Sequence, residues 1–266
     1  LDPDPSRMSL GGAIYAFSSR LEMDSSVCRS NRAIKGGCAA LVGFREDVPG
    51  LDSVGPSSLF ASSVTFSDNS AVVGGAVYLT DAGVVVLIAS TFRQNAAFRQ
   101  GGAVYTTATT PFFSSCRFEN NAAPAGGAIY STDISWIVSA ASSFFNVSGA
   151  NADYGPRGAT QATGVRVVND SARFIPQVAG GVLSPPLVFR VVDLFNQTVV
   201  EESPATATAK PIVLLAGATI VQSINGFLTF NSLILRAAPG TSIELIFNVI
   251  LPTGNNHNRF QTNSFP

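Results

Sequence analysis

The residues that could perform catalysis are few and scattered. Glycoside hydrolysis needs two carboxylates across one bond, and polysaccharide lyases need clustered acids for calcium with an Arg or Lys base. Asp81 and Asp133 share one repeat position two units apart, but the unit between them carries Ala108 there, so no adjacent pair forms. Asp68 and Glu119 fall in different registers. We therefore expect solvated turn acids, no catalytic residue and no enzyme.

The sequence also lacks the residue patterns of a metal or cofactor site. The only histidine, His257, lies in a polar tail where no His-Asp-Ser or Cys-His arrangement can be built around it. Three scattered cysteines and this distant histidine do not have zinc-ligand spacing. The Gly-Gly pairs lack the Lys and Ser/Thr of a phosphate loop. We expect no metal and no cofactor.

The three cysteines cannot all pair within the chain. Cys28 and Cys38 could form a disulfide that closes one repeat unit. Cys116 would then be the odd thiol, either buried as a small apolar side chain or bonded to a neighbouring chain.

Composition limits the class of protein. Only 12% of the 266 residues are charged and the net charge is −1, which argues against electrostatic capture of nucleic acid. The sequence holds no run of 18 apolar residues, the length that a helix needs to span a membrane. Three N-x-Ser/Thr sequons, with abundant Ser, Thr and Asn, favour an extracellular or cell-surface glycoprotein with candidate sites at Asn146, Asn169 and Asn196.

A repeated cassette organises the first part of the chain. A Gly-Gly-Ala-Ile/Val-Tyr box occupies residues 11–15, 74–78, 101–105 and 126–130, with a variant at 36–40. Before each box except the first, an aromatic residue or cysteine is followed three positions later by asparagine. The phenylalanines at 66, 92, 118 and 144 are spaced by a step of 26. Such a fixed period indicates stacked structural units.

Each unit reads as short β-branched and aromatic strands bounded by Gly and Asn, which matches one rung of a right-handed parallel β-helix over residues 1–156. Rungs about 4.8 Å apart place like residues on like. We predict an interior aromatic ladder of Phe66, Phe92, Phe118 and Phe144. We predict a second ladder, at a turn, of Asn69, Asn95 and Asn121.

One rung is longer than the others. The step from Gly36 to Gly74 is 38, and the excess falls in residues 42–57, which carry Glu46 and Asp47. This segment is either a tolerated surface insertion or a loop that makes contacts.

After residue 156 the repeat stops. Alternating runs at 164–168, 187–193, 227–235 and 243–247, separated by Pro/Gly turns, favour an immunoglobulin-like β-sandwich over residues 157–252. The polar residues 253–266 are interpreted as a linker toward a missing domain. Because the chain starts at Leu1 and stops after this polar run, we expect an excised or mature piece of a longer protein.

The pairing of Gly-Gly-Ala-Ile/Val-Tyr with Phe-x-x-Asn-x-Ala resembles the repeats of chlamydial polymorphic outer-membrane proteins and related repeats in large extracellular proteins of green algae and protists. The matching segments are residues 66–78, 92–105 and 118–130, with a weaker match at 28–40. The resemblance implies a right-handed, pectin-lyase-like β-helix that is secreted or surface-displayed. Segments 152–156, 185–199 and 226–233 look like the immunoglobulin-like module that follows such repeats in the algal proteins.

These features favour a non-enzymatic extracellular structural module of a filament, ciliary hair, wall or surface coat. Its expected partners are other copies or modules of the same assembly. The alternative is an adhesin that grips carbohydrate or protein through residues 42–57 or a β-helix face.

Overall fold

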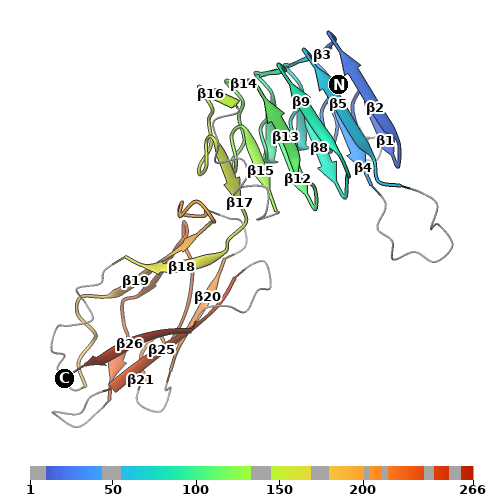
Figure 1. Ribbon diagram of the computed structural model, residues 1–266. Helices are drawn as coiled ribbons and strands as arrows, with labels where there is room; N and C mark the ends of the chain where they lie inside the picture. Colours follow the sequence, from blue (N-terminus) through green and yellow to red (C-terminus); the bar gives the residue numbers. More distant parts are fainter. Residues whose placement is uncertain are drawn as a thin grey trace. The chain divides into compact units, whose positions relative to one another are not determined.

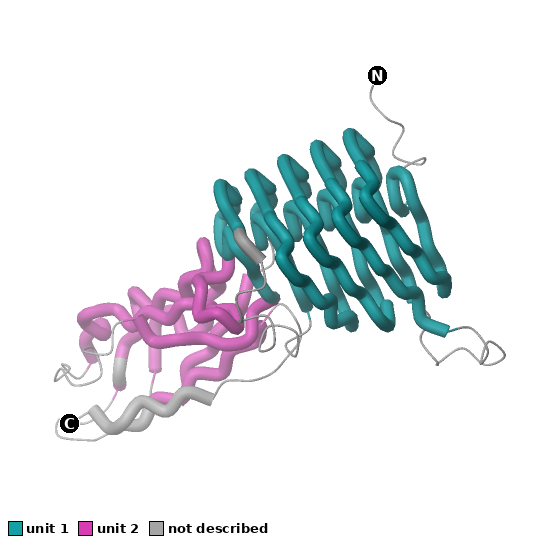
Figure 2. The backbone as a smooth tube through the Cα atoms, turned by 45° about the horizontal axis from the view of Figure 1, so that its top comes forward, with its two compact units in different colours: residues 1–160 teal, residues 161–266 magenta. Residues whose placement is uncertain are grey.

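The computed structural model is all-β and divides into two compact units, residues 1–160 and 161–266 (Figure 2). It describes residues 10–43, 55–132, 145–168, 180–200, 204–210, 215–236, 243–251 and 259–265. The border at 160 lies close to the predicted change of character at 156.

Unit 1 is a parallel β-solenoid of about five turns, with its rungs side by side (Figures 1 and 2). The first wall contains β1 (Ile14–Phe17), β4 (Ala39–Val42), β8 (Val77–Thr80), β12 (Val104–Thr107), β15 (Ile129–Ser131) and β17 (Gly158–Thr160). The second wall contains β2 (Arg20–Asp24), β5 (Ser58–Ser62), β9 (Val85–Ile88) and β13 (Pro111–Ser114).

The third wall contains β3 (Val27–Arg29), β6 (Thr65–Ser67), β10 (Thr91–Arg93), β14 (Cys116–Glu119) and β16 (Phe145–Ser148). The short fourth wall contains β7 (Ser70–Val73) and β11 (Ala96–Gln100), and single parallel bridges extend it to Arg32, Ala122 and Asn151. In all four walls each strand pairs in parallel with its equivalent in the next rung. The parallel β-helix is therefore confirmed, whereas its right hand stays a prediction.

The core lies between the walls because alternate residues of each strand point inward. Val77 and Leu79 of the first wall, Val85 and Leu87 of the second and Phe92 of the third are all nearly inaccessible to solvent. β-Branched and aromatic side chains suit this half-buried, pleated geometry. The apolar runs of the repeat thus supply one continuous core.

The Gly-Gly pair has two separate roles. Gly74 has a φ of +64°, a conformation that glycine adopts most readily. Gly75 sits where rungs approach closely: a Cβ there would lie 2.0 Å from the carbonyl oxygen of Gly102. The first glycine turns the chain and the second allows the rungs to stack.

Unit 2 consists of antiparallel sheets. One contains β18 (Gly164–Val167), β19 (Leu187–Val192) and β23 (Phe227–Phe230). Another contains β20 (Thr206–Lys210), β22 (Ile220–Gln222), β25 (Ile243–Ile250) and β26 (Arg259–Phe265), and a small pair joins β21 (Leu215–Ala216) to β24 (Ile234–Leu235). Phe189 and Phe230 of the first sheet both contact Phe247 of the second, each with ring centroids 5.0 Å apart. These contacts join the two sheets, and the immunoglobulin-like assignment stays a prediction.

The predicted linker at 253–266 is wrong over its second part, because Arg259–Phe265 forms β26 and pairs antiparallel with β25. An edge strand is held by backbone hydrogen bonds and tolerates polar side chains, so a polar composition does not exclude it. His257 lies outside the described residues.

We expect Gly75→Ala to destabilise unit 1 by more than about 3 kcal/mol, because the added Cβ meets the backbone of the next rung. Gly55→Ala is the matched control, since a Cβ at Gly55 meets nothing within 4 Å. Thermal unfolding followed by circular dichroism compares them. Equal melting temperatures for the two variants would contradict this account of the box.

Candidate functional site

The aromatic ladder fills the interior of the third wall. Phe66 pairs with Phe92, and Phe92 with Phe118, with ring centroids 4.7 and 4.6 Å apart and planes 10° and 6° from parallel. All three side chains have no exposed surface. In-register strands impose this stacking because their spacing is close to that of stacked rings.

The fourth predicted member of this ladder is corrected. Phe144 lies outside the described residues, and Val147 is the residue that pairs with Phe118. The step from 118 to 147 is 29, so the last rung holds three residues more than the period of 26. The extra residues shift the hydrogen-bond register, and register, not letter spacing, decides which side chain stacks.

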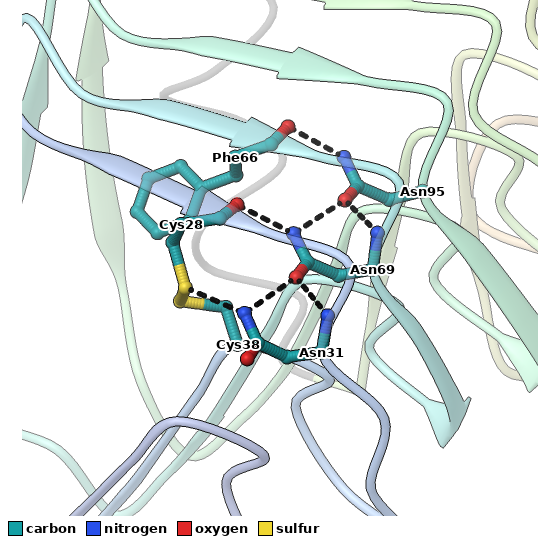
Figure 3. Close-up of a disulfide and its surroundings, with 6 residues drawn as sticks. All are labelled: Cys28, Asn31, Cys38, Phe66, Asn69 and Asn95. Carbon is teal, nitrogen blue, oxygen red and sulfur yellow. Dashed lines mark hydrogen bonds between the residues drawn. A yellow bond between two sulfur atoms is a disulfide. The ribbon is translucent and has the colours of Figure 1, made fainter.

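The asparagine ladder runs along the turn between the third and fourth walls (Figure 3). The amide oxygen of Asn95 accepts hydrogen bonds from the backbone N–H and the Nδ2 of Asn69, at 3.1 and 3.0 Å. The Nδ2 of Asn95 donates to Asn121 Oδ1 and to the Phe66 carbonyl, both at 3.0 Å. Both polar atoms of this fully buried amide are therefore satisfied.

Asn31 also belongs to this ladder, although the sequence predicted only Asn69, Asn95 and Asn121 as its members. Its backbone N–H and Nδ2 both donate to Asn69 Oδ1 at 3.0 Å. Its spacing of three from Cys28 was the available signal. At the other end, Asn121 Nδ2 donates to the Phe92 carbonyl at 2.9 Å.

Cys28 and Cys38 form a disulfide with a Cα–Cα distance of 6.1 Å (Figure 3). Cys28 pairs with Phe66, so the disulfide stands where the aromatic ladder begins. Asn31 Nδ2 lies 3.3 Å from Cys28 Sγ. A buried structural disulfide suggests an oxidising, extracytoplasmic compartment.

Cys116 is free and buried. Its Sγ lies 3.3 Å from the Leu87 carbonyl oxygen. Burial raises the pKa of this thiol, which opposes formation of the reactive thiolate. Of the two alternatives for Cys116, the structure supports the small buried side chain.

A tyrosine ladder lies on the first wall, on the face opposite the core. Tyr105 stacks on Tyr78 and Tyr130 with ring centroids 5.2 and 5.6 Å apart. Lys35 Nζ donates to the Tyr78 hydroxyl at 3.2 Å and lies 4.8 Å from the centre of its ring. Burial, and secondarily the charge of Tyr78, raises the pKa of Tyr105 to about 12.

The two ends of the predicted insertion, Val42 and Ser57, lie in contact. Ser57 is fully buried, and its hydroxyl donates to the Val42 carbonyl at 2.7 Å. The Gly83 N–H donates to the Ser57 carbonyl at 2.9 Å. Val42 and Ser57, the two ends of the predicted insertion, are thus held together, while Glu46 and Asp47 lie outside the described residues.

Two of the acids considered as catalytic candidates pair with arginines. Asp68 makes an ion pair with Arg29 at 3.2 Å, and Glu119 makes one with Arg117 at 3.2 Å. Asp133 lies outside the described residues. Within the described ranges, no group of three His, Cys, Asp or Glu residues could hold a metal ion.

The three sequons differ in their surroundings. Asn146 lies in β16 and pairs in register with Arg117. Asn169 lies outside the described residues. Asn196 is exposed in a turn at φ 60°, where its Oδ1 accepts a hydrogen bond from Arg190 Nη2 at 3.1 Å. Glycosylation of these sites stays a prediction.

Asn95→Ala should destabilise unit 1 by about 3–5 kcal/mol, because the N–H and Nδ2 of Asn69 and the Phe66 carbonyl lose buried partners. Asn31→Ala should cost only about 1 kcal/mol, since Asn31 is the first described member of the ladder and its backbone N–H still donates to Asn69. Urea unfolding of both variants gives the comparison. A loss for Asn95→Ala no larger than that for Asn31→Ala would be inconsistent with a cooperative ladder.

Alkaline pH should weaken unit 1 through Tyr105. Its pKa is raised from 10.0 to about 12, so the stability that it contributes is complete below pH 10 and falls as the pH rises toward 12. The loss amounts to roughly 2–3 kcal/mol at 1.36 kcal/mol per pKa unit. Urea midpoints at pH 9 and pH 11.5 should differ less for Tyr105→Phe than for the unchanged chain. An identical pH dependence would assign the effect to other groups.

Part of this repeat matches a known protein family. Residues 63–80 and 115–132 match the Chlamydia polymorphic membrane protein (Chlamydia_PMP) repeat. Each match runs from a third-wall strand, through the asparagine turn and the Gly-Gly pair, to the next first-wall strand. No curated protein and no solved structure shows significant similarity to the chain. No helix long and apolar enough to cross a membrane occurs in the described part of the chain. The chain carries Chlamydia PMP-type repeats, and these repeats form its β-solenoid.

Proposed function

We propose that this chain is a non-enzymatic structural module of a larger extracellular or surface-displayed protein. The observation that carries the proposal is the self-stacking of buried residues along the third wall and the turn that follows it. A phenylalanine ladder lies in the interior, an asparagine ladder lies at the turn, and a disulfide joins Cys28 to Cys38. Such a core makes a stiff body whose outer walls remain available for packing against neighbours.

Two further features support a surface location. The matching repeat belongs to a family of membrane and surface proteins, and a buried disulfide suits a secreted protein. A filament, ciliary hair, wall or coat would each use a stiff module of this kind. The proposal includes a right-handed solenoid, an immunoglobulin-like unit 2 and glycans on the sequons.

An adhesin is the second candidate, because residues 44–54 are inserted between Val42 and Ser57, which are hydrogen-bonded to each other. Loops held on rigid scaffolds commonly carry binding residues. Carbohydrate or protein would be the ligand in that case.

Replacing residues 44–54 with a short Gly-Ser linker separates the two candidates. A structural module should keep its concentration-dependent self-association in sedimentation and its melting temperature, since Val42 and Ser57 already lie in contact. An adhesin should keep its fold and lose binding to glycan arrays or host cells. A chain that stays monomeric at all concentrations while the loop captures a ligand would refute the structural role. Release of sugar from polysaccharide by the unchanged chain would refute the non-enzymatic assignment.

A further inference from the structure

Two turns of unit 2 lie side by side at one end of the sheet formed by β18, β19 and β23. The first turn, residues 193–197, follows β19 and is closed by an antiparallel bridge between Val192 and Thr198. The second turn, residues 224–227, leads into β23. Thr198 packs against this second turn so closely that a Cβ added to Gly226 would lie 2.7 Å from Thr198 Cγ2. The two turns are therefore neighbours in space.

Four large apolar side chains at these turns are exposed to solvent. Leu194 and Phe195 of the first turn are 37% and 44% exposed, and Ile224 and Phe227 of the second are 76% and 38% exposed. Single exposed apolar residues are ordinary on a protein surface, whereas several together indicate a surface that something covers. We call these four residues the turn patch.

Asn196 lies within the turn patch, on the outer side of the sheet. Phe189 and Leu228 point into the core, where both are fully buried. Their chain neighbours Arg190 and Phe227 pair in register and share the opposite, outer face. From this face the Arg190 guanidinium donates to the Asn196 carbonyl at 3.2 Å and to Asn196 Oδ1 at 3.1 Å. One arginine therefore contacts Asn196 and is the cross-strand neighbour of an exposed aromatic residue.

The amide of Asn196 leaves its nitrogen available. Asn196 is the first residue of an Asn-Gln-Thr sequon, and it is exposed. Arg190 uses only the two oxygens of this residue, and Asn196 Nδ2 donates to none of the described residues. An N-linked sugar replaces one hydrogen of Nδ2 and leaves Oδ1 able to accept. The folded turn therefore accommodates a glycan without losing a hydrogen bond.

We propose that Asn196 carries an N-linked glycan whose first sugars cover the turn patch. In the transfer, Nδ2 forms a bond to the anomeric carbon of an oligosaccharide held on a lipid pyrophosphate. The bond from that carbon to the pyrophosphate oxygen breaks, the lipid pyrophosphate leaves with the electron pair, and Nδ2 gives up one proton. This inference rests on the extracellular location in the proposed function. It selects one of the three sequons and gives its glycan a role.

A sugar suits the turn patch in its chemistry and its attachment. The C–H groups on one face of a sugar ring pack against the electron-rich face of an aromatic ring, while the hydroxyl groups stay in water. A glycan bonded to Asn196 is also held beside Phe195 and Phe227 at a high effective concentration, so weak contacts suffice. Asn146, in contrast, lies within strand β16 of the third wall.

Secretion of the full chain from a eukaryotic cell that performs N-glycosylation tests the site. Enzymatic release of the glycans in heavy-oxygen water converts each modified asparagine to labelled aspartate, which peptide mass spectrometry locates. Most chains should carry the label at Asn196. Thr198→Ala should abolish it, whereas the matched Thr198→Ser should keep it because the sequon remains.

The possible failures are distinguishable. Label at Asn146 or Asn169 without label at Asn196 overturns this inference and leaves the extracellular structural role standing. A secreted chain without label at any of the three overturns the inference and also the glycoprotein part of the proposed function.

Fluorescence of a dye that binds apolar surface tests the covering role. The Thr198→Ala chain should give about twofold more fluorescence than the glycosylated chain, because the turn patch is then uncovered. Adding Ile224→Ser should remove most of this increase. Adding Phe98→Ser instead is the matched control, since Phe98 lies in unit 1 and is 75% exposed, against 76% for Ile224.

The control should leave the increase in place, and circular dichroism should show the same fold for every variant. Equal fluorescence with and without the glycan overturns the covering role. An increase that survives Ile224→Ser but not Phe98→Ser overturns the assignment of the covered surface to the turn patch.

Discussion

In-register stacking of parallel rungs constrains the buried ladders of the third wall and of the turn that follows it. There each residue meets its equivalent about 4.8 Å away, so the side chain must interact favourably with a copy of itself. Asparagine can do so because its amide both donates and accepts, as between Asn69 and Asn95. Aspartate at these positions would repel its copy, and a buried unpaired charge is costly. Phenylalanine meets the same requirement by stacking, and the second box glycine meets it by lacking a Cβ.

At the limits of the described ladders, other residues take the places of phenylalanine. At one end Cys28 replaces the aromatic residue and a covalent bond takes the place of ring stacking. At the other end Val147 covers Phe118, and it is only partly buried. Departures from the motif at Cys28 and Cys38 thus coincide with a change from ring stacking to a covalent bond.

The sequence alone predicted the solenoid and most ladder members because fixed chain length between Phe66, Phe92 and Phe118 translates directly into register. The same reasoning failed at Phe144. This residue lies 26 positions after Phe118, but the rung holds three residues more than 26, so Val147 pairs with Phe118 instead. The tail failed for another reason: backbone pairing of β26 needs no apolar pattern. In the sequence, the β-bulge of β11 between Ala97 and Gln100 appears only as the step of 27 residues from Gly74 to Gly101. This step does not show which residue between Asn95 and Gly101 is extruded.

A solenoid separates the determinants of folding from those of function. Buried strands and ladders fix the interior, so the same Phe and Asn ladders would support a coat protein and an adhesin equally well. What distinguishes such proteins must lie outside the ladders, at positions where one rung differs from the next. In unit 1 these are the insertion anchored by Ser57 and the bulge that exposes Phe98. The first changes one corner of the solenoid and leaves the ladders intact; the second alters a wall whose neighbouring rungs are lined with alanine.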